Sequence, residues 1–223
     1  MANEHSADQG CTLKLILVPS LITLAVTILR LVGELQHWSP VFFNRAGGGG
    51  GAVVGISWLA PIFGIYFALK LAGSGARPGS LGKAALFTVV GLLVMVGGGV
   101  LLGLGLGRNF AIALGGFIVL AAAAVIPMAG WPALTKTLIA YGYAARIPVA
   151  IIMFLAMQGN WGTHYDAAAP PFDAMPLLTR YLELGLLPQL IIWIAFTVIT
   201  GSLLGIIAVA IFCRPAPAAQ ATP

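Results

Sequence analysis

The chain has 223 residues, of which 60% are hydrophobic and only 8% are charged, and its formal net charge is +5. A water-soluble domain of this length carries roughly 25% charged residues, so these few charges cannot cover a globular surface. The composition therefore excludes an ordinary soluble domain and favours a protein embedded in lipid. The basic residues are scattered singly between apolar runs, which argues against a nucleic-acid partner and suits residues that anchor membrane helices.

Six apolar runs of about the length of a spanning helix, roughly 20 residues, follow one another along the chain. They cover residues 13–32, 52–72, 84–107, 109–131, 134–158 and 184–213. We therefore predict an all-α, polytopic integral membrane protein, a bundle of about six transmembrane helices in a single domain over residues 1–213. The count falls to five if the fifth run, which contains Arg146, does not cross completely. Residues 214–223 are rich in Pro and Ala and are predicted to form a disordered tail.

The connections between these runs differ in length. Residues 107–109 allow only a tight turn between antiparallel helices, whereas residues 35–51 and 159–183 form long segments. In the second long segment, a short amphipathic helix over residues 172–183 is expected to lie at the membrane interface. The five glycines from Gly47 to Gly51 are interpreted as a flexible linker, because no Gly-Lys-Ser/Thr follows them as in a phosphate-binding loop.

The basic residues of the connections predict the orientation, since cytoplasmic loops of membrane proteins carry an excess of Lys and Arg. One set of connections and termini holds Lys14, Lys70, Arg77, Lys83, Lys136 and Arg214. The opposite set holds Arg45, Arg108 and Arg180. This asymmetry places both termini in the cytoplasm, in agreement with an even number of helices. We expect a multi-pass protein of a cell membrane of the bacterial inner-membrane type.

Arg146 is the most informative residue, because a charge near the middle of a membrane helix is costly. It follows Lys136 by roughly 15 Å of helix, which places it near the bilayer midplane. No acidic residue lies at that depth in another predicted helix, so its guanidinium is expected to face water or an anionic ligand. Tyr143 is expected to stack on the guanidinium or to join the same cavity. Alternatively, residues 132–145 form an interfacial helix and Arg146 extends to the headgroups.

Arg30 and Glu34 have the four-residue spacing of an ion pair on one helical face. The simpler interpretation is a structural pair, and the alternative is that Glu34 binds a cation or a proton. On the same predicted side of the membrane lie His37, His164 and Asp166. These side chains could join Glu34 in a metal or proton site, although solvated loop residues give the same pattern. Because no pair has ligand spacing on a shared helix, we predict no metal and no cofactor.

Glycine residues predict close helix packing. Gly99, Gly103 and Gly107 form a GxxxGxxxG pattern in the third predicted helix, and Gly115 and Gly116 lie near the start of the fourth. Because small residues let helix backbones approach closely, we expect the third helix to pack through this stripe on the fourth helix or on another subunit. The expected partners are the lipid bilayer and, in the second case, a further copy of the chain or another membrane protein.

Three classes of function follow from these features. The first is a small transport or permeation protein in which Arg146 lines an anion-accessible cavity. The second is a non-catalytic scaffold or accessory subunit packed through its glycine stripes. The third is a membrane enzyme with an outward-facing site around His164, Asp166 and Glu34. No nucleophile, nucleotide-binding or haem-attachment motif supports an enzyme directly.

Overall fold

The structure is a computed structural model that describes residues 2–47 and 52–213, with side chains from residue 12 onward. Its helices are α1 (Ala2–Leu35), α2 (Leu59–Gly73), α3 (Leu81–Gly105), α4 (Phe110–Val125), η2 (Ile126–Ala129), α5 (Pro132–Gly159), η3 (Phe172–Ala174), α6 (Leu177–Arg180), η4 (Tyr181–Leu186), η5 (Pro188–Ile192) and α7 (Trp193–Phe212). Of these, η2 and η3 are 3-10 turns, and η4 and η5 are π-helical. No strand occurs in the described ranges, so the predicted all-helical class is confirmed. The predicted tail over residues 214–223 lies outside the described residues.

Five helices of the described chain are long and apolar enough to cross a membrane. They are Thr12–Leu35, Leu81–Gly105, Phe110–Ala129, Pro132–Gly159 and Leu177–Phe212, the last being α6, η4, η5 and α7 in one continuous helix. A separate interfacial helix over residues 172–183 was therefore a wrong expectation, because residues from Leu177 onward belong to this long helix.

The second predicted run, residues 52–72, forms a shorter helix than expected. Its helical part, α2, has 15 residues, or about 22 Å, against a hydrocarbon core of roughly 30 Å. Residues 52–58 are turns and irregular backbone. Within them, a Cβ on Gly55 would lie 3.1 Å from Nη1 of Arg30. The irregular backbone therefore passes close to the Arg30 guanidinium.

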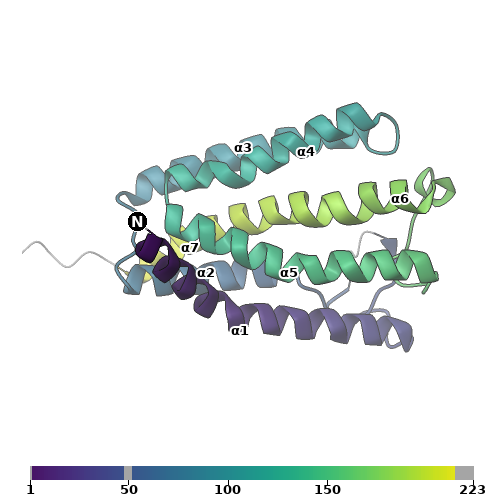
Figure 1. Cartoon of the computed structure of the whole chain (residues 1–223), viewed down its shortest axis with the longest axis horizontal. Helices are drawn as coiled ribbons and strands as arrows, with labels where there is room; N and C mark the ends of the chain where they lie inside the picture. Colours follow the sequence, from purple (N-terminus) through teal and green to yellow (C-terminus); the bar gives the residue numbers. More distant parts are fainter. Residues whose placement is uncertain (1, 48–51, 214–223) are drawn as a thin grey trace, which may run out of the picture.

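The helices lie side by side along one direction, and the connections gather at two opposite ends (Figure 1). The start of α3, the start of α5 and the end of α7 share one end, and α2 begins midway along the bundle and runs to that end. There Nε1 of Trp131 donates to the carbonyl of Ala76 at 2.8 Å. At the other end, the backbone nitrogen of His164 donates to the Glu34 carboxylate at 2.8 Å. The two sets of connections distinguished by their basic residues thus lie at opposite ends.

Helix α7 is central, because it packs against α2, α3, α4 and α5. Its backbone touches that of α2, since a Cβ on Gly64 would lie only 2.3 Å from Cα of Gly201. Beside this contact, Phe67, Leu138 and Val198 form part of a fully buried core. This packing holds α5 and the long C-terminal helix in fixed register, which positions the cavity described below.

The predicted glycine stripe does not form the contact between α3 and α4. Nothing lies within 4 Å of a Cβ built on Gly99 or Gly103, so both face away from the rest of the chain. Gly98 and Gly105 of α3 make the contact instead, and a Cβ on Gly105 would lie 2.2 Å from the backbone nitrogen of Ala113. Glycines of α3 do form the contact with α4, as expected. The sequence pattern could not show which of two neighbouring glycine-containing faces of α3 makes this contact.

The other glycines of that prediction have separate roles. Gly116 of α4 is a true contact, since its Cβ would lie 2.6 Å from the backbone nitrogen of Leu102. A Cβ on Gly115 would lie 3.4 Å from Cδ2 of Leu101, which is an ordinary van der Waals distance. Gly107 lies beyond the end of α3 with φ of 70°, a left-handed conformation that glycine adopts without strain, and it begins the expected tight turn.

Candidate functional site

A cavity of about 430 Å³ lies between α1, α5 and the long C-terminal helix. Its polar lining includes Arg30, Arg146, His164, Glu183 and Gln189. Its apolar lining includes Val149, Met153, Leu184, Ile192 and Trp193. The volume falls within the range of about 300–1,000 Å³ that small-molecule sites occupy. Charged groups beside an apolar wall suit a small organic ion.

Arg146 lies halfway along the 28-residue helix α5 and is only 4% exposed. The helix runs without a break from Pro132 to Gly159, which contradicts the alternative of an interfacial segment over residues 132–145. One guanidinium nitrogen, Nη1, donates to Oε1 of Gln189 over a long 3.4 Å. Among the described residues, no carboxylate forms an ion pair with Arg146. A buried positive charge therefore faces the cavity, and within the described part of the chain its side-chain hydrogen-bond acceptor is the amide of Gln189.

The ring on which this guanidinium stacks belongs to Trp193, whose centre lies 4.2 Å from Cζ of Arg146. The expectation for Tyr143 was wrong, because its side chain is 40% exposed on the outer face of α5. The other nearby tyrosine, Tyr141, is buried and its hydroxyl lies 2.8 Å from Oγ1 of Thr23. Contacts within one helix suggested Tyr143, whereas a residue from another helix supplies the ring.

Gln189 lies in the π-helical segment η5 (Pro188–Ile192) of the long C-terminal helix, and Trp193 is the first residue after this segment. The amide of Gln189 also contacts the sulfur of Met153, with Nε2 3.4 Å from Sδ. π-Helical turns inside α-helices are frequently found at functional sites. Sequence reasoning missed Gln189, although a Pro-Gln pair within an apolar run is a visible signal.

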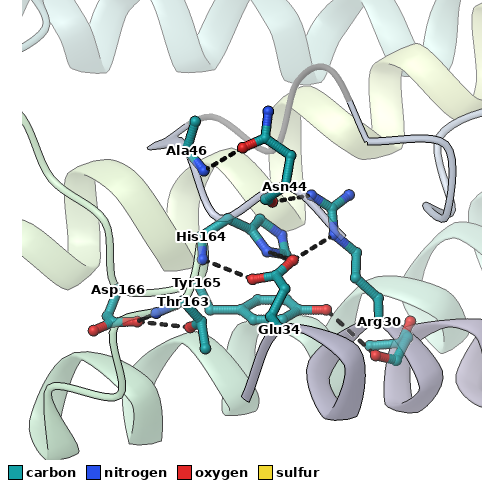
Figure 2. Close-up of polar contacts among 9 residues, drawn as sticks. Arg30, Glu34, Asn44, Ala46, Thr163, His164, Tyr165 and Asp166 are labelled. Carbon is teal, nitrogen blue, oxygen red and sulfur yellow. Dashed lines mark hydrogen bonds and ion pairs between the residues drawn. The ribbon is translucent and has the colours of Figure 1, made fainter. Parts of the chain in front are cut away.

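A cluster of polar side chains joins the end of α1 to the connection between α5 and α6 (Figure 2). Nε of Arg30 donates to Oε1 of Glu34 at 2.8 Å, which confirms the predicted ion pair. Nδ1 of His164 lies 2.6 Å from the same oxygen, and the His164 backbone nitrogen donates to Oε2 at 2.8 Å. Arg30 also donates from Nη2 to the carbonyl of Asn44 at 3.2 Å. Glu34 thus holds two segments of the chain together.

The predicted meeting of four outer residues is limited to Glu34 and His164. The carboxylate of Asp166 accepts hydrogen bonds from Gly162 and Thr163 and stabilises its own loop (Figure 2). His37 is exposed, with Nδ1 2.9 Å from the carbonyl of Leu35. Across the described residues, no group of three His, Cys, Asp or Glu side chains is arranged to hold a metal ion.

The protonation of His164 depends on opposing influences. Burial lowers its pKa below the ordinary 6.5, the hydrogen bond to Glu34 raises it, and the positive charge of Arg30 lowers it again. Because an ionised carboxylate only accepts hydrogen bonds, Nδ1 of His164 must carry the proton that it donates to Glu34. Burial has the opposite effect on the adjacent Tyr165, a neutral acid, and raises its pKa. The Tyr165 hydroxyl donates to the carbonyl of Thr27 at 3.4 Å. His164 is therefore neutral at pH 7, with Nε2 as its basic nitrogen.

Glu183 contributes a second carboxylate to the cavity lining. It is buried, and its Oε2 accepts a hydrogen bond from the backbone nitrogen of Gly107 at 3.0 Å. This bond ties the long C-terminal helix to the turn between α3 and α4. The sequence gave no sign that Glu183 would line a cavity with Arg146, because the two residues lie on different helices.

Comparison with protein-family models, curated protein sequences and solved structures found no match to this chain.

Proposed function

We propose that the protein is a small transport or permeation protein of a cell membrane, and that it binds an organic anion at Arg146. The observation that carries this proposal is the buried guanidinium of Arg146, without a carboxylate partner in the described chain, on the wall of a cavity of about 430 Å³. A charge at this depth of a membrane helix is costly, and such residues typically mark ligand or ion pathways.

In the proposed topology the chain crosses the membrane six times, with both termini in the cytoplasm. Five passes are the long apolar helices, and α2 with the irregular segment before it makes the sixth. Ile56 and Ser57, just before α2, line the cavity, so the amino-terminal end of this short helix lies beside it. Helix amino termini favour anions, and many transporters bind substrates at such interrupted helices near the bilayer midplane.

The lining favours a carboxylate with an apolar body. An arginine guanidinium can bind both oxygens of a carboxylate through paired hydrogen bonds. Val149, Met153 and Ile192 provide an apolar wall for the remainder of such a molecule. Inorganic anions would leave this wall unused, so sulfate and phosphate are expected to bind more weakly than an aromatic carboxylate.

The test is a binding titration of the detergent-solubilised protein with benzoate, followed by tryptophan fluorescence. Trp193 contacts Arg146 and should report an occupied site. We expect saturable binding of benzoate, much weaker response to benzamide, and loss of binding in Arg146→Gln. The exposed Arg108 provides a matched control, because Arg108→Gln should bind as the wild type does. The replacement Trp193→Phe should abolish the signal and so locate it.

Benzoate binding unchanged in Arg146→Gln would refute the proposal. Transport itself is tested by uptake of labelled benzoate into proteoliposomes, against protein-free liposomes. Arg146→Leu should abolish protein-dependent uptake while thermal stability does not fall, since leucine removes the cost of holding a charge at this depth of a membrane helix.

A second candidate is a membrane hydrolase that uses His164 as a general base. The hydrogen bond between Glu34 and His164 favours it, because a carboxylate that orients a histidine is the usual arrangement of such bases. Ser57 lines the same cavity. Release of nitrophenol from a p-nitrophenyl ester, lost in both His164→Gln and Ser57→Ala, would support this candidate over transport. Absence of any release by the wild type would count against it.

A further inference from the structure

We propose that the anion enters this cavity together with one proton, and that His164 takes up that proton. This inference rests on the proposed function, because it concerns an anion bound at Arg146. It adds the substrate class, a monovalent weak acid bound as its anion plus a proton.

The charged side chains around the cavity are balanced in pairs. Arg30 and Glu34 form an ion pair and cancel each other. Across the cavity, the positive charge of Arg146 and the negative charge of Glu183 balance without forming an ion pair. With His164 neutral, these four groups carry no net charge, and Asp166, which does not line the cavity, places one further negative charge near His164.

A bound monovalent anion changes this balance. It adds one negative charge to a site lined by buried and half-buried side chains, where an uncompensated charge is costly. One proton on the site restores neutrality. Uptake of an anion with a proton therefore costs less than uptake of the anion alone, and the combined step moves no net charge.

His164 is the group placed to accept the proton. Its ring lines the cavity, and Glu34 already occupies Nδ1, so the proton is added at Nε2. The charged groups that face it are Glu34 and Arg30 from α1 and Asp166 from its own loop, with the Tyr165 ring packed against it. Two carboxylates against one guanidinium favour the imidazolium, and burial opposes it. A bound anion adds the further negative charge that tips this balance.

Glu34 is a poorer proton acceptor than His164. Its two oxygens already accept bonds from Arg30 and His164, which favour the ionised carboxylate. Glu183 is the serious competitor, because it lines the same cavity and its protonation would restore neutrality equally well. The two possibilities differ in one respect: only uptake by His164 requires the imidazole ring.

The experiment measures benzoate binding by calorimetry on the full-length protein from about pH 6 to about pH 8, where benzoate stays ionised as ordinary carboxylates do. Above the pKa of His164 in the empty protein, uptake of one proton predicts that affinity falls up to about tenfold per pH unit. Titrations in two buffers of different ionisation enthalpy should show uptake of close to one proton per benzoate. His164→Gln should abolish the uptake and flatten the pH profile. The exposed His37 gives the matched control, since His37→Gln should retain both.

A second variant, Glu183→Gln, keeps an acceptor for the Gly107 backbone and removes one negative charge. It should bind benzoate more tightly at high pH and with less proton uptake, which tests the charge balance, and His164→Asn tests the imidazole ring if His164→Gln does not fold. Unaltered proton uptake in His164→Gln, or unaltered uptake and affinity in Glu183→Gln, would overturn the inference. Wild-type affinity that does not vary with pH would overturn it as well, while leaving the anion site at Arg146 intact. No benzoate binding at any pH would refute both this inference and the proposed function.

Discussion

The carboxylate of Glu34, near the end of α1, accepts two hydrogen bonds from His164, one from its backbone nitrogen at 2.8 Å and one from Nδ1 at 2.6 Å. The two residues are 130 positions apart in the chain. Together with Arg30 they fix the connection between α5 and α6 against α1 and place the imidazole ring in the cavity wall. The stability of this end of the bundle and the chemistry of the cavity therefore depend on the same carboxylate.

Replacing Glu34 by Ala should strongly destabilise the protein. The carboxylate is fully buried, and its loss removes the acceptor of Nε of Arg30 and of both His164 nitrogens. Breaking a buried pair of this kind costs about 3 to 5 kcal/mol. Denaturant unfolding in detergent, followed by circular dichroism, measures the change. Glu34→Gln should cost less because it keeps an acceptor, and Asp173→Ala, at an exposed acid of the same end, should be neutral. Equal stability of the Glu34→Ala and Asp173→Ala proteins would contradict the argument.

The stability of the empty protein should fall as the pH falls below about 6.5. The folded protein lowers the pKa of His164 from 6.5, so the unfolded chain binds a proton at a higher pH than the folded chain does. The stabilising contribution of neutral His164 is fully present above its pKa in the unfolded chain. It is lost as the pH falls towards its pKa in the folded protein. Thermal melting from about pH 7.5 to about pH 5 measures this loss. His164→Gln should reduce the slope in this window, and a slope identical to that of the wild type would assign the effect to other groups.

Two glycines of the α3–α4 pair should respond oppositely to alanine. A Cβ on Gly116 would lie 2.6 Å from the backbone nitrogen of Leu102, and overpacking of this kind costs about 1 to 3 kcal/mol. A Cβ on Gly103 meets nothing within 4 Å, so Gly103→Ala should be neutral or stabilise α3 by up to about 1 kcal/mol through helix propensity. Melting temperatures and the yield of folded protein measure both effects. If Gly103→Ala lowers them instead, this face of α3 packs against another protein.

Reporter fusions test the proposed orientation. Ser74 and the end of α7 lie at one end of the bundle, and the connection that contains Ala168 lies at the other (Figure 1). Fusions at Ser74 and at the C-terminus should report the cytoplasm, and a fusion at Ala168 should report the opposite side of the membrane. A cytoplasmic signal from Ala168 would mean that α2 and its preceding segment do not make the sixth pass.

Sequence patterns located some residues of the site and misassigned others. The depth of Arg146 within its apolar run and the spacing of Arg30 and Glu34 are local properties, so both could be recognised. Tyr143 was the wrong ring for Arg146, because neighbours along one helix were the only neighbours that the sequence displayed. For a similar reason the glycine pattern did not show which face of α3 contacts α4, since Gly98 and Gly99 are indistinguishable by type, and packing of the Gly99–Gly103 face on another subunit stays a prediction.

The sequence by itself determined the helical class, the tight turn at Gly107 and most of the long apolar helices, because length, composition and spacing within one segment control these features. Only the tertiary structure decided which charged groups meet. The pairing of Glu34 with His164, the stacking of Arg146 on Trp193 and the place of Glu183 all join segments that are distant in sequence. Such contacts depend on the rotation and register of packed helices, which the burial of many side chains sets together and no single segment encodes.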